Sequence, residues 1–194
     1  MKTQPAATSE GLVVISPMKR RHVRQILKIE KQVYPRPWAA SVFTNEIGAP
    51  KHHRRYVVAR IDSRVVGYGG LMFAEDARDG SPSAHITNIA VDPAWHRHKI
   101  GTRLMLVLAR LAREQGAVGL TLEVRHTNVA AQRLYHRFGF LQEGVRKRYY
   151  ENTDDALVLW ASGIHQPAYT ERLADLASEV PGPTLTEGLF DGDS

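Results

Sequence analysis

The chain has 194 residues, of which 43% are hydrophobic and 24% are charged, a composition typical of one globular domain with a short extension rather than of a disordered or fibrous protein. It contains no cysteine, which excludes disulfides, cysteine-ligated zinc, iron-sulfur clusters and a cysteine nucleophile. No apolar run approaches the roughly 20 residues that a membrane-spanning helix needs. The polar first ten residues also lack the apolar core of a signal peptide, so we expect a cytoplasmic protein with no membrane partner.

The net charge of +6 is unevenly distributed. Residues 165–194 contain one basic and six acidic residues, which leaves residues 1–164 with 25 basic and 14 acidic residues and a net charge of +11. A basic body suits a phosphate-rich cofactor, RNA or an RNA-bound protein, but an arginine-rich composition alone gives the same charge. We expect a flexible leader at residues 1–11, a folded domain at residues 12–164, and a mostly mobile acidic tail at residues 165–194, in which TERLADLASEV can form one short helix.

The first helix is predicted directly after Ser16-Pro17, because a capping residue followed by proline is a typical helix start. Apolar residues recur at helical spacing from there to about residue 32, and the proline-rich segment 34–37 ends the helix. A second short helix is expected from Trp38 to about residue 48. The first part of the chain therefore predicts a pair of helices.

The rest of the chain alternates between strands and helices. The expected elements are strands at 56–61 and 65–73 around a turn, a strand at 85–92, a helix at about 102–115, a strand at 119–125, a helix capped by Asn128, and strands near 140–148 and 156–160. This order predicts an α/β (α+β) architecture with a central mixed sheet flanked by helices on both faces.

Strands 85–92 and 119–125 are each followed by a helix, and loops beyond the carboxyl ends of such strands form ligand sites. The basic segment 96–102 lies between the first of these strands and its helix, where free backbone amides and the positive helix end can hold an anion. Such a loop is more often structural than functional. It matches neither GxxxxGK[ST] nor GxGxxG, which argues against a nucleoside triphosphatase and a dinucleotide oxidoreductase.

Several motifs follow one another in a characteristic order: IAVDPAWHRHKIG, LEVR, NxAA, LYxxFGF and RxRYY. In this order the chain resembles the GNAT superfamily of acetyl-CoA-dependent N-acetyltransferases over residues 12–162. The LEVR, LYxxFGF and RYY segments are most similar to the family of bacterial ribosomal-protein alanine N-terminal acetyltransferases. The resemblance implies the GNAT acyl-CoA N-acyltransferase fold, with residues 12–164 as the N-acetyltransferase domain.

The resemblance also implies acetyl-CoA as co-substrate. The cofactor-binding residues that it implies are the backbone amides of Arg97, His98, Lys99, Ile100, Gly101 and Thr102 for the pyrophosphate, the backbone of Ile89, Ala90 and Val91 for the pantetheine arm, and Asn128. Lys99 stands where the family usually has glycine. If its backbone φ is positive, we expect a strain of about 1–2 kcal/mol, which an ammonium near the phosphates partly offsets.

Acetyl transfer to an amine needs a proton acceptor for the amine, an amide for the oxyanion and a proton donor for the thiolate. The resemblance implies Glu123 as the general base, the region of Val91 as the oxyanion donor, and Tyr135 as the proton donor. Taken singly, Glu123 is more often a surface carboxylate and Tyr135 an ordinary helix aromatic, but their placement in LEVRxxN and LYxxFGF favours function.

Trp38, Tyr149 and Tyr150 are candidates for a groove that orders a peptide acceptor, whereas Tyr34 is interpreted as an ordinary core aromatic. Core or strand packing remains an alternative for all three candidates. The nine histidines show no HExxH motif, so we expect no metal.

The preferred function is acetylation of a protein N-terminus, with a ribosomal protein alanine as the substrate that the resemblance implies. An α-amino group, with a pKa near 7.7–8.0, is more often neutral at pH 7 than lysine is, near 10.4. Lysine or small-molecule acetylation stays open, as does a non-catalytic module that binds RNA or the ribosome. We expect a monomer that contacts nucleic acid only indirectly.

Overall fold

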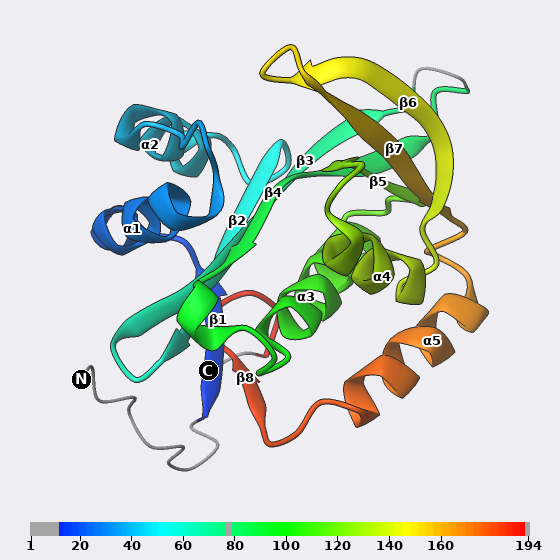
Figure 1. Cartoon of the computed structure of the whole chain (residues 1–194). Helices are drawn as coiled ribbons and strands as arrows, with labels where there is room; N and C mark the ends of the chain where they lie inside the picture. The colour runs from blue at the N-terminus through cyan, green and yellow to red at the C-terminus, as the bar shows by residue number, and fades with distance from the viewer. Residues whose placement is uncertain (1–11, 77–78, 193–194) are drawn as a thin grey trace.

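The computed structural model describes residues 12–76 and 79–192, which form one mixed sheet with helices on both faces (Figure 1). The strands are β1 (Val13–Pro17), β2 (Arg54–Ile61), β3 (Arg64–Glu75), β4 (Pro82–Val91), β5 (Gly119–Arg125), β6 (Leu141–Tyr150), β7 (Asp154–Ser162) and β8 (Thr184–Thr186). The helices are α1 (Val23–Val33), α2 (Ala40–Gly48), α3 (Ile100–Glu114), α4 (Val129–Arg137) and α5 (Pro167–Ser178), with short 3-10 helices at Arg20–His22 and Pro93–Trp95.

The strand order across the sheet is β6-β7-β5-β4-β3-β2-β1-β8. On one face, Ile26 of α1 and Phe43 of α2 pack with Tyr68 of β3. On the other face, Leu104 and Leu108 of α3 belong to a larger core that also includes residues of α4 and α5 (Figure 1). These two apolar layers confirm the predicted mixed sheet with helices on both faces.

The start of the domain differs from the prediction. Residues 13–17 form a strand that pairs antiparallel with β2, from Val13 opposite Ile61 to Pro17 opposite Val57. The first helical turn begins only at Arg20, after Lys19 donates its backbone N–H to Nδ1 of His22. Ser16-Pro17 therefore ends a strand instead of starting a helix, because Val13 and Ile15, on one side of this strand, bury their side chains in the core.

The second helix also begins later than predicted, at Ala40, so Trp38 lies in the loop that joins α1 to α2. The backbone N–H of Trp38 donates to Oε2 of Glu30 at 2.7 Å. This bond anchors the loop to the buried end of α1.

The acidic C-terminal segment belongs to the fold, which corrects the expectation of a mostly mobile tail for residues 165–192. The expected short helix is present as α5, and β8 extends the sheet by pairing parallel with β1. Four large side chains of this segment are buried: Tyr169, Leu176, Leu189 and Phe190. These apolar residues are spaced among acidic ones, so the average composition of the segment hides them. The expected leader at residues 1–11 lies outside the described residues.

None of the helices in residues 12–76 and 79–192 is both long enough and apolar enough to cross a membrane.

Candidate active site

β4 and β5 are parallel neighbours that separate along their length. Backbone pairing joins only residues 83–85 to residues 119–121, although β4 continues to Val91 and β5 to Arg125. A β-bulge lies in the same region, because Gly70 pairs with Asn88 whereas its neighbour Leu71 pairs with Ile86, which leaves Thr87 without an opposite residue. The carboxyl halves of the two strands are therefore open to a ligand that enters between them.

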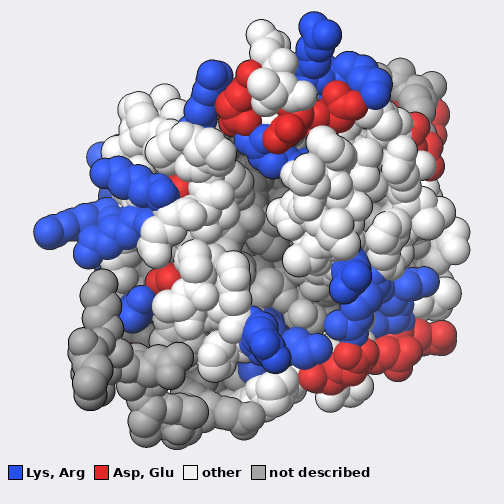
Figure 2. All heavy atoms as spheres, in the orientation of Figure 1, with Lys and Arg blue, Asp and Glu red and all other residues white. Residues whose placement is uncertain are grey.

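A cavity of about 600 Å³ lies at this separation, a volume typical of small-molecule sites. The space-filling view shows the surface hollowed between the α1–α2 side and the α3–α4 side of the molecule (Figure 2). The lining comes from the α1–α2 segment, both separated strands, the start of α4 and the β6–β7 hairpin. Segments far apart in the chain thus meet around one space.

The exposed edge of β4 follows from its hydrogen bonding with β3. Asp92 N–H donates to the carbonyl of Val66 at 2.9 Å, which marks residues 66 and 92 as a hydrogen-bonded pair. Bonding direction alternates along a strand, so Ala90 also faces β3, whereas the backbone groups of Ile89 and Val91 face the opening. The predicted backbone contacts to a ligand arm are therefore geometrically available at Ile89 and Val91, but not at Ala90.

Two side chains lie against this open edge. The hydroxyl of Tyr34 donates to the carbonyl oxygen of Ile89 at 2.9 Å and lies equally close to Oδ1 of Asn88. Nε2 of His96 lies 3.3 Å from the carbonyl oxygen of Val91. Both contacts confirm that these two carbonyls point away from β3.

The loop between β4 and α3 presents free backbone amides. Within the described part of the chain, no residue accepts a hydrogen bond from the backbone N–H of residues 97–102, and the first amide bonded within this turn is that of Arg103, to the carbonyl of Lys99 at 3.0 Å. The loop reaches this shape with positive φ angles at Arg97 (70°) and Lys99 (57°). Free amides at a helix start form an anion site, and such a site fits the pyrophosphate of a nucleotide cofactor.

Lys99 takes the left-handed conformation for which glycine is best suited. Its Nζ atom lies 3.9 Å from Oε2 of Glu179, which also pairs with Arg137. The lysine side chain thus extends toward the end of α5, and the backbone of the loop stays open.

The remaining side chains of the loop fix its position. Ile100 and Thr102 are buried, and His98 packs edge-on against Trp95 with ring centroids 5.4 Å apart. A Cβ on Gly101 would lie 3.3 Å from Leu134 of α4, so this glycine allows α3 and α4 to approach closely.

Glu123 is a largely buried carboxylate with a partner on each oxygen. Oε2 lies 3.0 Å from Nε2 of His85, and Oε1 lies 3.1 Å from a guanidinium nitrogen of Arg146. Hydrogen bonding from His85, followed by the charges of His85 and Arg146, lowers the pKa of Glu123 even though burial opposes this change. Glu123 is therefore ionised at neutral pH.

Tyr135 lies on the buried side of α4 and lines the same cavity. Burial raises the pKa of its hydroxyl well above the ordinary value, and the nearby Tyr150 adds to this effect. No described residue forms a hydrogen bond with this hydroxyl. Tyr135 thus keeps its proton at neutral pH and has it available for a ligand in the cavity.

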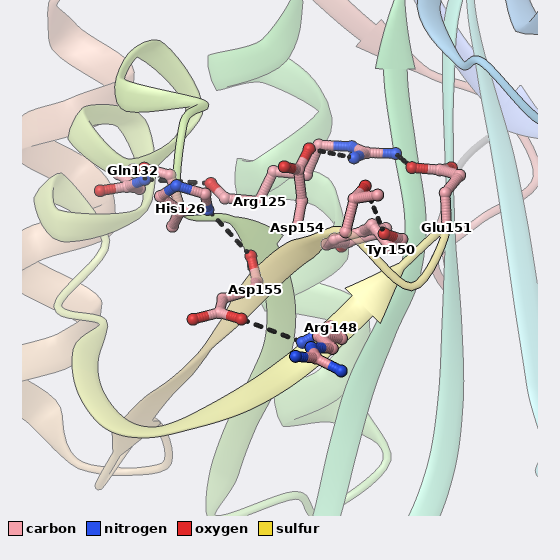
Figure 3. Close-up of polar contacts among 9 residues, drawn as sticks. Arg125, His126, Gln132, Arg148, Tyr150, Glu151, Asp154 and Asp155 are labelled. Atoms are coloured by element: carbon pink, nitrogen blue, oxygen red, sulfur yellow. Dashed lines mark hydrogen bonds and ion pairs between the residues drawn. The ribbon is translucent and has the colours of Figure 1, made fainter.

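The β6–β7 hairpin is fastened to the end of β5 by the contacts that Figure 3 displays. Arg125 pairs with Glu151 and with Oδ2 of Asp154, the latter at 2.7 Å. The Tyr150 hydroxyl donates to the carbonyl of Glu123 at 3.3 Å, and the guanidinium of Arg125 lies 4.3 Å from the centre of the Tyr150 ring. These bonds hold the aromatic end of the hairpin over the cavity.

The aromatic candidates line the cavity from opposite sides. Tyr149 and Tyr150 pack edge-on with ring centroids 5.1 Å apart, and Trp38 contributes from the α1–α2 loop. Asn128 also lines the cavity while its Oδ1 accepts the N–H of Ala131 at 3.1 Å, which makes it the cap of α4. Its side-chain oxygen is therefore committed to the helix, and its amide nitrogen is the group that can reach a ligand.

A buried polar cluster supports the α1 side of the cavity. Glu30 is fully buried, and its carboxylate accepts hydrogen bonds from the Tyr68 hydroxyl, from the Trp38 N–H at 2.7 Å and from Nδ2 of Asn88 at 3.3 Å. Burial raises the pKa of Glu30, and the bonds from Trp38 and Asn88 oppose that change. The cluster ties α1 and its loop to β3 and β4.

Residues 23–140, more than half of the chain, match the acetyltransferase (GNAT) family. The chain belongs to this acetyltransferase family. It is 36% identical over 140 residues to N-alpha-acetyltransferase RimI of Mycobacterium tuberculosis (strain ATCC 25618 / H37Rv), and the aligned region covers 71% of this chain and 84% of the relative. It is 28% identical over 150 residues to the ribosomal protein bS18-alanine N-acetyltransferase of Escherichia coli (strain K12), and the aligned region covers 75% of this chain and 94% of the relative.

The crystal structure of the ribosomal-protein-S18-alanine N-acetyltransferase from Escherichia coli has the same fold. It matches with a TM-score of 0.66 and 23% sequence identity, over 78% of this chain and 94% of that chain. The predicted GNAT fold is therefore confirmed.

Within this GNAT fold, the structure brings together most of the residues that the sequence singles out. Glu123, Tyr135, Asn128, Ile89, Trp38, Tyr149 and Tyr150 all line the cavity. The loop at 97–102 lies outside the lining, at the start of α3. Its free amides form an anion site apart from this cavity.

Sequence reasoning missed His85 and Glu30, and it assigned no role to Arg146, although this residue opens the RxRYY motif. Glu30 falls seven residues after Val23 on the apolar side of α1, so helical spacing alone could have identified it as a carboxylate on the buried face. No local pattern marks His85 or indicates that Arg146 contacts Glu123, because these residues meet Glu123 only through strand pairing. No group of three metal-ligating side chains occurs within the part of the chain that the structure describes.

Proposed function

We propose that this GNAT protein transfers the acetyl group of acetyl-CoA to the α-amino group of a protein, with the N-terminal alanine of a ribosomal protein as the acceptor. One observation carries the proposal: an ionised carboxylate, Glu123, and a protonated hydroxyl, Tyr135, line the same cavity where β4 and β5 separate. Acyl transfer to an amine needs both a proton acceptor and a proton donor. The names of the relatives support this choice of acceptor.

The site fits acetyl-CoA as the second substrate. The free amides of residues 97–102 would hold its pyrophosphate, and the exposed backbone of Ile89 and Val91 would bind its extended arm in the manner of an added strand. The amide nitrogen of Asn128 would reach the arm from the opposite wall. The arm then points its thioester toward Glu123 and Tyr135.

The acceptor enters from the other side of the cavity, between Trp38 and the Tyr149–Tyr150 pair. Aromatic walls order an extended peptide by packing and by hydroxyl hydrogen bonds. An α-amine is neutral far more often than lysine at pH 7, which favours a protein N-terminus as the nucleophile. We propose that residues 12–164 carry the N-acetyltransferase site of a domain that residues 165–192 complete, with the region of Val91 as the donor to the oxyanion.

The test uses two matched peptides and acetyl-CoA. One peptide begins with a free alanine and contains no lysine, and the other has a blocked N-terminus and one internal lysine. We expect a mass gain of one acetyl group and equimolar thiol release with the first peptide only. Acetylation of the lysine peptide alone would contradict the proposal and leave a lysine acetyltransferase as the function.

Calorimetry with acetyl-CoA separates the enzyme from a non-catalytic module. Binding at micromolar concentrations is the expected result. Failure to bind acetyl-CoA, together with salt-sensitive RNA binding, would contradict the proposal and favour a module that binds RNA.

A further inference from the structure

His85 lies opposite Glu123 at the point where β4 and β5 separate. It occupies the last paired position of the two strands, with Thr121 as its partner, and its side chain lines the cavity. Its Nε2 atom lies 3.0 Å from Oε2 of Glu123. A carboxylate at this distance from an imidazole orients the ring, as in enzymes where histidine is the general base.

Glu123 is poorly placed to accept the amine proton by itself. Both of its oxygens already face donors, His85 on one side and Arg146 on the other. These contacts lower the pKa of the carboxyl group, and a carboxylate with a lowered pKa is a weaker base. A neighbouring group that Glu123 assists is therefore a better placed proton acceptor than Glu123 itself.

The contact with Glu123 also determines which ring nitrogen of His85 is basic. A carboxylate oxygen only accepts hydrogen bonds, so the ring hydrogen of neutral His85 lies on Nε2 and the lone pair lies on Nδ1. No described residue forms a hydrogen bond with Nδ1. We propose that Nδ1 of His85 accepts the proton of the attacking amine and that Glu123 orients His85 and stabilises its charged form. This inference rests on the proposed function.

The resulting step is balanced in atoms and charge. The neutral α-amine forms a C–N bond with the acetyl carbonyl carbon, and the carbonyl oxygen becomes negative. Nδ1 of His85 removes one proton from the nitrogen. The carbonyl re-forms, the C–S bond breaks, and the sulfur leaves with its electron pair and takes a proton from Tyr135. His85 then releases its proton to water and Tyr135 regains one, so the products are the amide and the thiol of coenzyme A.

Other charged or titratable groups line the same cavity. From the elements around the cavity they are Glu30, Tyr34, Arg36, Glu46, Arg54, Arg125, Tyr135, Tyr149, Tyr150 and Glu151, and Arg146 contacts Glu123 itself. Carboxylates and guanidinium groups in one cavity act on a nearby charge in opposite directions. A comparison between variants is therefore more informative than one absolute titration.

The decisive variant is His85→Gln. The glutamine amide can still donate to Glu123 but cannot accept a proton, so it separates positioning from proton transfer. With an alanine-starting peptide and saturating acetyl-CoA, we expect kcat/KM to fall by about 100-fold, in the range typical of a lost general base. Acetyl-CoA affinity should stay within about threefold, and the shape of the pH–rate profile should change relative to wild type.

Three further measurements make the test complete. His52→Gln, an exposed histidine outside the cavity, should keep wild-type activity. The double variant with Glu123→Gln should lose little more than His85→Gln alone, because the two residues act as one unit. If His85→Gln folds poorly, His85→Ala replaces it, and added imidazole should restore part of the activity.

The inference is overturned if His85→Gln retains the wild-type kcat/KM and pH profile while Glu123→Gln loses activity, because Glu123 would then act alone. It is equally overturned if imidazole has no effect on a folded, inactive His85→Ala variant. A wild-type protein that acetylates no free N-terminus would instead contradict the proposed function, so the two failures are distinguishable.

Discussion

The hydroxyl of Tyr135 is buried and forms no hydrogen bond with a described residue. Such a hydroxyl is suited to donate its proton to a departing thiolate. Replacement by phenylalanine removes the proton and leaves the ring. We expect Tyr135→Phe to lower kcat by about 10- to 1,000-fold, since general acid catalysis contributes on that order, and to leave the acetyl-CoA Kd nearly unchanged. Steady-state kinetics and calorimetry measure the two quantities. Wild-type turnover of this variant between pH 6 and 9 would contradict the assignment.

Glu123 links the protonation of the site to folding. Its pKa is lowered from the ordinary 4.5 in the folded protein, so it contributes stability above that value and loses the contribution as pH falls through the lowered pKa. We expect wild type to be more stable than Glu123→Gln at pH 7, and the difference to shrink steadily below pH 4.5. Urea unfolding at several pH values measures it. An advantage that stays constant down to pH 3 would show that the carboxylate is not the source.

At the scale of elements, the loop before α3 places strain and charge at one residue. Lys99→Gly relieves a left-handed backbone that costs about 1–2 kcal/mol for a side-chain residue, but it also removes a cation from the loop, where it now pairs with Glu179. We expect the two effects to oppose each other, so that acetyl-CoA affinity changes by less than about tenfold, or 1.4 kcal/mol. Calorimetry decides this, with Lys99→Ala as the control that loses the charge but keeps the strain. A larger loss in both variants would mean that the ammonium itself binds the ligand.

The buried cluster around Glu30 connects α1 to the sheet, so its loss should affect more than one element. Glu30→Ala leaves the donors of Trp38, Tyr68 and Asn88 without their acceptor. We expect the free energy of unfolding to fall by about 2–4 kcal/mol, because buried donors without partners are costly. Urea unfolding gives the value, and the exposed Lys31→Ala on the same helix is the matched control. Equal stability of both variants would show that water replaces the carboxylate.

At the scale of the whole molecule, the C-terminal segment completes the sheet and the core. Leu189 is buried, whereas Leu185 on β8 is 44% exposed. We expect Leu189→Ala to lower the free energy of unfolding by about 2–4 kcal/mol, as buried leucines do, and Leu185→Ala to lower it by less than about 1 kcal/mol. A truncation after residue 165 should destabilise the protein more than either. If the truncated chain unfolded at the wild-type urea concentration, the segment would be an independent tail.

Local patterns in the sequence determined the main elements of this protein. The alternation of residues 119–125, the apolar spacing of α3 and the cap at Asn128 each depend on neighbours a few residues apart, so their elements are predictable. The order of the motifs likewise indicated the family, and it identified Glu123 and Tyr135 as members of one site. Ser16-Pro17 shows the limit of local reasoning, since the pairing of that segment with β2 outweighed a typical helix start.

Only the tertiary structure decided which distant groups meet. The separation of β4 from β5, the contact of His85 with Glu123, and the addition of β8 to β1 all depend on pairing between strands far apart in the chain. Strand register is set by the combined burial of many side chains, and no short segment carries that information. For the same reason, the acidic composition of residues 165–192 concealed four side chains that become apolar anchors once the core is present to receive them.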